Sequence, residues 1–344
     1  MEYFAGLDVS LRSCAVCVVD GKGTVLHERE LPCDIEEIAG YLTALRFPIE
    51  RVGFEAGAMC QHLYYGLKSE GFEVVCMEAR QVSAALSAMR NKTDRNDARG
   101  IAQVLRMGWF NPVYMKSREA HGIRALLSTR KAPLSKTIDL ANEVRGLLKI
   151  FGIRLPKTVQ HGSFDGMVRP IVEMDEVLAH ALLPLLDARL ALHQHFLELD
   201  RRVKRAARQD EVCLRLMTAP GVGPVTALTF KAAVDGPARF KRSRTVAAHF
   251  GLTPLRYQSG EQDNPGRISK AGDRDVRATL YAAANSLLVR TKAGSQIKSW
   301  GMRLMRTKGR RRAVVAVARK LAVLLHRMWV DGTEFRSGTV EGMA

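Results

Sequence analysis

The 344-residue sequence predicts an α/β domain at the N-terminus, then a helical connector, then a mainly α-helical domain. Up to residue 106, short apolar runs that end in turn signals alternate with segments of helical spacing, which is typical of an α/β domain. From residue 119 onward, helical spacing dominates. Because a single core stops growing near about 250–300 residues, more than one domain is expected. We place the three parts at 1–117, 118–212 and 213–344.

The charge of the chain favours a polyanionic partner. Lys and Arg total 53 against 35 Asp and Glu, for a net charge of +18, so nucleic acid is favoured and a membrane surface is the weaker alternative. No apolar run approaches the roughly 20 residues of a spanning helix, and the start lacks the order of a secretory signal. A cytoplasmic protein is expected. The six cysteines lack the spacing of a zinc site and are expected to be reduced and mostly buried.

The first hundred residues predict the order β-β-β-α-β-α-β-α. The first strand ends in Asp8, and the turn signal Asp20-Gly21-Lys22-Gly23 separates the second strand from the third. The expected strands are 3–8, 15–19, 24–30, 51–55 and 72–77, and the expected helices are 35–45, 61–69 and 93–106.

Four carboxylates stand at the ends of predicted strands or at the start of a predicted helix. Asp8 ends the first strand, Glu55 ends the fourth, and Asp94 and Asp97 lie three apart on one face of the last helix. Converging carboxylates repel unless cations neutralise them, and Mg²⁺ prefers such oxygen ligands. Two ions about 4 Å apart would suit phosphodiester chemistry. Taken singly, each acid could be a solvated turn residue or, for Asp94, a helix cap. Together they are the arrangement of RNase H/RuvC-like nucleases.

Several segments resemble one family of mobile-element enzymes. GLDVS at the start, FEAG around Glu55 and RNKTDRNDARGIAQVL around Asp94 resemble the DEDD insertion-sequence transposases, the family of the Piv DNA invertase and of the bridge-RNA-guided serine recombinases. In the C-terminal half, TAPGVGPVTALTF, AAHFGLTPLRYQSG and GRISKAGDRDVRATLYAAA resemble the transposase domain of that family. The resemblance spans most of the chain, in order.

The resemblance implies a set of roles. Asp8, Glu55, Asp94 and Asp97 match the four acidic positions that bind metal, and Ser259 matches the catalytic serine. Some relatives carry an acid before that serine, where this chain has Gln258, so no role for a carboxylate is expected there. A structured guide RNA and a dimer or tetramer also follow from the resemblance alone.

The middle of the chain is helical and leaves two questions open. Residues 119–148 carry interleaved cations, among them Arg124, Arg130 and Lys131, and these form either a solvated face or a groove for nucleic-acid backbone. Residues 173–205 have helical spacing interrupted by Pro184, which is expected to end or kink a helix. This predicts a hairpin or coiled-coil arm that either connects domains or joins protomers, and the resemblance favours the second.

Two short motifs mark the C-terminal half. The Gly221-Val222-Gly223 turn is typical of helix-hairpin-helix modules that hold a phosphate, and also of ordinary helix-helix turns. Ser259 taken alone would be a turn serine, since a nucleophile needs a base, a metal or a strong field, and His249 is the nearest histidine. Ser269 is the rival for the role, and a helix cap is expected for it.

Basic residues cluster at three places, and the contacts of the densest cluster are expected to be largely independent of base sequence. The densest run spans 303–312 and is followed by an amphipathic helix over 313–329. The expected nucleic-acid contacts are Lys92, Arg95, Arg99, Arg267, Lys270, Arg274, Arg306, Lys308, Arg310 and Arg311.

The sequence therefore predicts a recombinase that excises and inserts an insertion sequence through a phosphoserine intermediate. Mg²⁺ at the four acids would assist, and donor DNA, target DNA and a guide RNA would be the partners. A second hypothesis is a RuvC-like nuclease or junction resolvase that activates water and needs no serine. A third is a non-catalytic nucleic-acid-binding protein that keeps the scaffold.

Overall fold

A computed structural model describes residues 2–87, 91–156, 159–259 and 262–337. The chain divides into two compact units, Met1–Lys116 and Ser117–Ala344. No helix among these described residues is long and apolar enough to cross a membrane.

The first unit confirms the expected α/β domain. Its elements are β1 (Tyr3–Val9), β2 (Ser13–Asp20), β3 (Val25–Pro32), α1 (Ile35–Ala44), β4 (Ile49–Glu55), α2 (Cys60–Ser69), β5 (Val74–Met77), α3 (Ala79–Leu86) and α4 (Asp94–Met107). The strand order is β3-β2-β1-β4-β5. The strands β1, β2 and β3 form an antiparallel meander, while β4 and β5 run parallel to β1.

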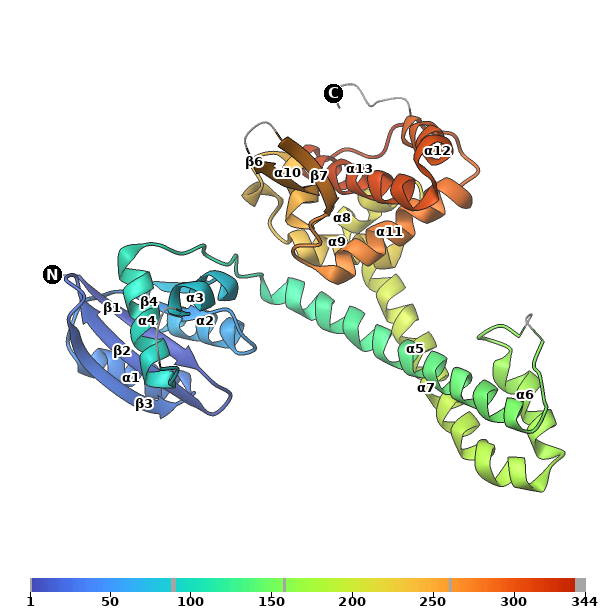
Figure 1. Ribbon diagram of the computed structural model, residues 1–344, viewed down its shortest axis with the longest axis horizontal. Coiled ribbons are helices and arrows are strands. Elements are labelled where there is room, and N and C mark those ends of the chain that lie inside the picture. The colour runs from blue at the N-terminus through green and yellow to red at the C-terminus, as the bar shows by residue number, and fades with distance from the viewer. Residues whose placement is uncertain (1, 88–90, 157–158, 260–261, 338–344) are drawn as a thin grey trace. The chain divides into compact units, whose positions relative to one another are not determined.

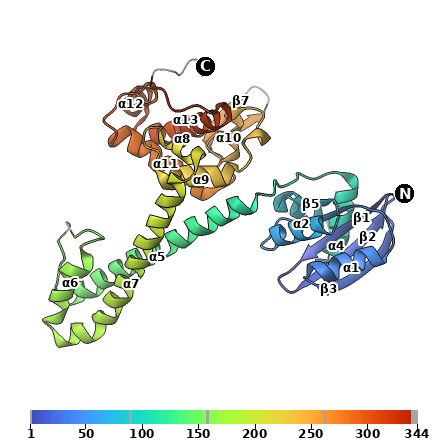
Figure 2. The same cartoon turned by 180° about the vertical axis from the view of Figure 1, so that it is seen from behind.

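Helices cover both faces of this sheet (Figures 1 and 2). One apolar cluster joins one sheet face to α1 and α2, through residues such as Leu7 and Leu63, and a second joins the other face to α3 and α4. Helix α3 was not predicted. Only Val82 of its eight residues is fully buried, so the apolar periodicity that would reveal a helix is nearly absent.

The second unit is almost entirely helical. Its elements are α5 (Arg118–Ile150), α6 (Phe164–Glu173), α7 (Glu176–Arg208), α8 (Glu211–Met217), α9 (Pro224–Val234), a 3-10 turn η1 (Pro237–Arg239), α10 (Ser243–His249), β6 (Pro254–Ser259), β7 (Gln262–Ile268), α11 (Arg274–Val289), α12 (Gln296–Lys308) and α13 (Arg310–Asp331). Helices α8 to α13 surround one large core.

Two 33-residue helices, α5 and α7, pack along each other as an arm that carries α6 at its far end (Figure 1). Of the two outcomes expected at Pro184, an end of the helix is wrong, because α7 continues through this residue. A proline removes one helical hydrogen bond. The neighbours Leu182 and Leu186 are fully buried in the core at the arm's tip, and that burial offsets the loss.

Candidate functional site

The register of the central strands places Asp8 beside Glu55. Strands β1 and β4 are parallel neighbours, with Gly6 opposite Gly53, and each acid lies two residues further on. A Cβ atom on either glycine would collide with α4, at 2.3 Å from the backbone nitrogen of Ala102 in the case of Gly6. Alternate residues of a strand share a face. Both carboxylates therefore lie on the α4 face, at the carboxyl end of the two strands.

The first turn of α4 supplies the other two acids. The helix begins after Thr93, whose Oγ1 accepts a hydrogen bond from the Asn96 backbone N–H at 3.2 Å. Thr93 is thus the cap, and the alternative capping role for Asp94 is wrong. The carboxylates of Asp94 and Asp97 are therefore not needed to cap the helix.

The four carboxylates share one electrostatic field. Burial, followed by the charges of Asp97, Asp94 and Glu55, raises the pKa of Asp8 to about 6, and Lys92 opposes the shift. Burial also raises the pKa of Glu55, with Lys92 lowering it and Asp97 raising it. Carboxylates raise one another's pKa values when they lie near each other. Acids that are far apart in the sequence therefore lie in the same region, at one end of the sheet.

The donor chemistry of this cluster fits a hard divalent cation. The four side chains offer only carboxylate oxygens, the ligands that Mg²⁺ prefers. Within residues 2–87, 91–156, 159–259 and 262–337, no group of three His, Cys, Asp or Glu side chains is already close enough together to hold a metal ion. The other three acids thus influence the pKa of Asp8, but the carboxylate oxygens of the four acids do not surround a single point at which an ion could bind.

Two of the three cations expected near these acids are engaged by a residue that the sequence did not reveal. Arg95 and Arg99 both pair with Glu28 of β3, at 2.5 Å and 2.9 Å. These ion pairs fix the solvent face of α4 against the sheet edge. Lys92 is exposed and acts on the acids through its charge. No sequence signal links Glu28 to residues about 70 positions away.

The serine of interest lies in a strand rather than in a loop. Ser259 is the last residue of β6, opposite Gln262 of β7 in a two-stranded antiparallel sheet. Its side chain falls outside the described part of the structure. The expected helix-capping role of Ser269 is wrong. Its Oγ accepts from the Ala271 backbone N–H at 3.4 Å, and Asp273 caps α11 instead.

A basic hollow of about 1190 Å³ lies beside this hairpin. Three of the expected nucleic-acid residues line it: Arg267, Lys270 and Arg311. Arg312, from the basic run 303–312, lines it as well, and the sequence missed four other residues that line the hollow: Arg244, Trp300, Arg319 and Lys320. They come from α10, α12 and α13, and only the fold brings these helices together.

The other expected cations lie outside the hollow's lining. Arg274 is exposed in the first turn of α11, and Arg306 and Lys308 are exposed on α12. Arg310 donates to the Asn285 side chain at 2.8 Å. Gly309, with φ 80°, divides the basic run between α12 and α13. The first turn of α13 holds no acid, although a helix N-terminus favours negative charge. An anionic partner would relieve this repulsion.

The cations of α5 have a structural role that the sequence left open. Arg124 pairs with Asp273 at 2.6 Å, and Lys131 pairs with Asp275 at 2.5 Å. These pairs tie the arm to the start of α11. The remaining pair, Arg130 with Asp200 at 2.6 Å, joins α5 to α7. These cations are therefore not a purely solvated face. Arg124, Arg130 and Lys131 also line a pocket of about 460 Å³, and the groove for nucleic-acid backbone stays a prediction.

The glycine turn and the cysteines are explained by packing. Gly221 has φ 82°, and a Cβ there would lie 2.5 Å from the Ala283 carbonyl oxygen of α11. This contact requires glycine whether or not a phosphate binds.

His249 contacts the rings of Phe240 and Phe250. All six cysteines are free, and four of them are buried.

Comparisons with known proteins agree over most of the chain. The model described as "Transposase IS116/IS110/IS902 family" matches residues 213–299. A second model, described as "Transposase" and of the DEDD type of IS110, matches residues 5–153.

Two curated relatives extend this similarity. The chain is 29% identical over 346 residues to "Transposase for insertion sequence element IS1111A" of Coxiella burnetii, covering 97% of this chain and 91% of the relative. It is 30% identical over 304 residues to "Putative transposase y4pF/y4sB" of Sinorhizobium fredii, covering 85% and 76%. Among solved structures, Thermus thermophilus RuvC in complex with a Holliday junction substrate matches 33% of this chain and 100% of that chain, with 18% identity and a TM-score of 0.26.

Proposed function

The chain belongs to the IS116/IS110/IS902 family of transposases and is a DNA transposase, and from this premise we propose that it cuts and rejoins DNA through a phosphoserine intermediate. It excises and inserts an insertion-sequence element in the cytoplasm. The observation that carries the proposal is the register that sets Asp8 beside Glu55, where burial, followed by the charges of Asp97, Asp94 and Glu55, raises the pKa of Asp8 to about 6.

Ser259 is the proposed nucleophile. Its Oγ gives up its proton to solvent and attacks a backbone phosphorus atom, a P–O bond to deoxyribose breaks, and the released sugar oxygen takes a proton from solvent. The serine ester conserves the energy of the broken bond, so the reverse attack by a sugar hydroxyl on another strand rejoins DNA without a nucleotide cofactor. Arg267 and Lys270, close behind Ser259 in sequence, bind the phosphate oxygens.

Asp8, Glu55, Asp94 and Asp97 would hold divalent cations, with Mg²⁺ as the ion that suits their oxygens. When bound, such ions supply positive charge to a phosphoryl group and lower the pKa of a coordinated oxygen. The carboxylates themselves position the ions, and Lys92 offsets part of their mutual repulsion. That such ions assist the attack by Ser259 follows from the family resemblance and belongs to this proposal.

The partners and assembly are part of the same proposal. Donor and target DNA bind the basic residues of the second unit, and an element-encoded guide RNA selects both by base pairing. In this proposal the arm, residues 118–212, is a domain of its own. It joins protomers through a coiled coil into a dimer or tetramer. The glycine turn between α8 and α9 serves as a helix-hairpin-helix contact to phosphate.

A protein–DNA adduct tests the proposal. The full-length protein is incubated with Mg²⁺, RNA from the flank of its element, and end-labelled donor and target DNA, and products are separated on a denaturing gel. We expect a covalent adduct in the wild type that is lost in Ser259→Ala and in Asp94→Asn. The matched controls are Ser269→Ala and Glu37→Gln, an exposed acid on α1, and both retain the adduct.

The main alternative is a RuvC-like nuclease or junction resolvase that uses the same acids to activate water. Cleavage without an adduct, unchanged in Ser259→Ala, would establish this alternative. A non-catalytic nucleic-acid-binding protein would bind without cleavage, and Asp8→Ala would then alter stability alone.

A further inference from the structure

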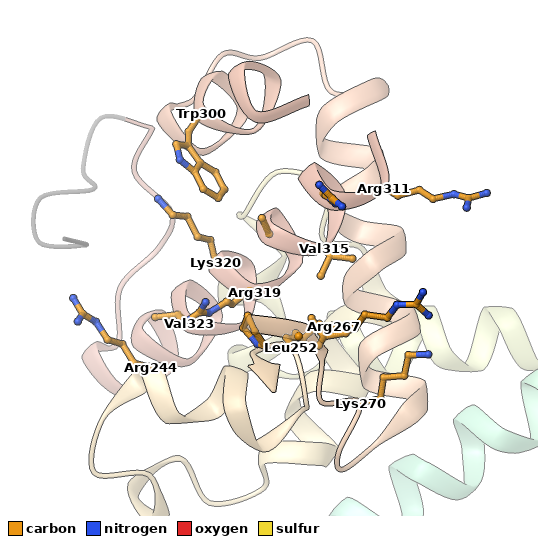
Figure 3. Close-up of a pocket in the computed structure, with 15 residues that line it drawn as sticks. Arg244, Leu252, Arg267, Lys270, Trp300, Arg311, Val315, Arg319, Lys320 and Val323 are labelled. Atoms are coloured by element: carbon orange, nitrogen blue, oxygen red, sulfur yellow. The ribbon is translucent and has the colours of Figure 1, made fainter. Parts of the chain in front are cut away.

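The basic hollow beside the β6–β7 hairpin has two kinds of wall (Figure 3). The apolar side chains Leu252 and Val315 lie near the centre of the view, Val323 lies to their left, and the cations Arg244, Lys270 and Arg311 lie around them. Leu252 is almost fully buried. Among the described residues that line the hollow, none is acidic. Cations around an apolar floor favour a ligand that is anionic on one side and apolar on the other.

An aromatic wall completes the hollow. Trp300 of α12 is half-buried, and the Lys320 ammonium lies 4.0 Å from the centre of its ring. Burial lowers the pKa of Lys320, so an anion bound beside it would favour its charged form. A flat ring, an apolar floor and nearby cations are the parts that bind single-stranded nucleic acid through stacking and phosphate contacts.

We propose that this hollow binds one unpaired nucleotide of the DNA strand being cut, with its base against Trp300 and the floor and its phosphate among the surrounding cations. A paired duplex would present only phosphates and would leave the apolar floor uncovered. The cavity of about 1190 Å³ exceeds what a single base needs, so it accommodates the base together with its sugar and flanking phosphates.

The position of the hollow favours DNA over RNA, and this step rests on the proposed function. Gly266 and Arg267 of β7 line the hollow, and Gly266 lies about 13 Å along that strand from Gln262, at about 3.3 Å per residue. Gln262 is the partner of Ser259 in the hairpin. The strand that occupies the hollow is therefore within a few nucleotides of the proposed nucleophile, and in a transposase that strand is DNA.

A cycle of protein and DNA changes tests the base contact. Fluorescein-labelled 12-nucleotide DNA, either intact or with abasic sites throughout, is titrated with the full-length protein and binding is followed by anisotropy. We expect wild type to bind the intact strand about tenfold more tightly than the abasic strand, since stacking on an aromatic side chain is worth that or more. Trp300→Ala abolishes this preference, whereas Trp300→Phe keeps most of it.

Charge variants test the phosphate contact. Arg319→Gln is expected to weaken both strands by the same factor and to reduce the salt dependence of binding. Lys292→Gln removes an exposed cation from the loop before α12, outside the hollow's lining, and changes binding less than twofold. Because Trp300→Ala could disturb the core, the wild type is also irradiated with DNA that contains 5-iododeoxyuridine, and the cross-linked peptide is expected to contain Trp300.

An equal preference for intact DNA in wild type and Trp300→Ala, or cross-links only outside the lining residues, would overturn the inference. Tighter binding of the matched RNA strand through Trp300 would overturn the assignment to DNA. Neither result depends on adduct formation. The inference and the proposed serine chemistry therefore fail separately.

Discussion

Replacing Asp8 by asparagine tests the carboxylate cluster without any DNA. The pKa of Asp8 is raised from 3.8 to about 6, so the folded state binds its proton more tightly than the unfolded state does. The free energy of unfolding therefore falls as pH rises from about 4 to about 6, and the full cost of the ionised group applies above that range. Asp8→Asn removes the charge and the cost.

The magnitude follows from the shift. At about 1.4 kcal/mol for each pKa unit the cost would be about 3 kcal/mol. Asp8 is only half-buried, and solvent screening reduces the effect to about 1–1.5 kcal/mol. This corresponds to a rise in Tm of about 4–8 °C for the first unit of Asp8→Asn at pH 8 in EDTA. At pH 4 the two proteins should melt together.

Calorimetry of the full-length protein measures this difference, and hydrogen exchange of peptides from β1, β4 and α4 assigns the transition to the first unit. Added Mg²⁺ is expected to raise the Tm of the wild type, because a bound ion supplies positive charge beside the carboxylates. The same addition should have little effect on Asp8→Asn, which lacks one of these carboxylates. Glu37→Gln, on the other face of the sheet, should show no dependence on pH or Mg²⁺. A destabilised Asp8→Asn, or the same difference at pH 4 and pH 8, would refute the shared-field reasoning.

Three further changes test other parts of the fold. Gly6→Ala should push α4 away from β1, because its new Cβ would lie 2.3 Å from the Ala102 nitrogen, and we expect a loss of about 2–3 kcal/mol by urea unfolding; unchanged stability would contradict the close contact. Arg189→Met leaves Asp165 without its buried partner and should cost about 3–5 kcal/mol, whereas the double change with Asp165→Leu should recover most of it; no recovery would mean that the pair itself stabilises the arm. His326 is buried, contacts the Ser243 hydroxyl and the Pro237 carbonyl, and has a lowered pKa, so stability of the second unit should fall as pH drops below about 6.5, and His326→Gln should flatten that slope in calorimetry.

The sequence predicted the sheet and its acids because both depend on local pattern. Short apolar runs ending in Asp8 and Glu55 mark strand ends, and the spacing of Asp94 and Asp97 marks one helix face. The register that sets Gly6 opposite Gly53 completes the cluster. Glycine at both positions is the one signal that could have revealed the close contact with α4.

Contacts over long separations could not be predicted in this way. The hollow joins Leu252, Arg267 and Lys320, which no period or motif relates. Local propensity alone favours a helix end at Pro184, and the burial of the neighbouring leucines outweighs it. Serine and aspartate are both favoured helix caps, and the structure uses Asp273, four residues after Ser269, to cap α11.

In the arm formed by α5 and α7, each helix is held in a fixed rotation about its own axis relative to the other helix. Each has 33 residues, or about 50 Å at 1.5 Å per residue. Arg130 clamps the two helices together by pairing with Asp200 and by lying 5.0 Å from the centre of the Phe196 ring. One residue added to α5 beyond this clamp would turn everything past it by about 100°. Insertions or deletions among relatives should therefore occur in both helices at once and in whole helical turns, so that the tip of the arm keeps its orientation.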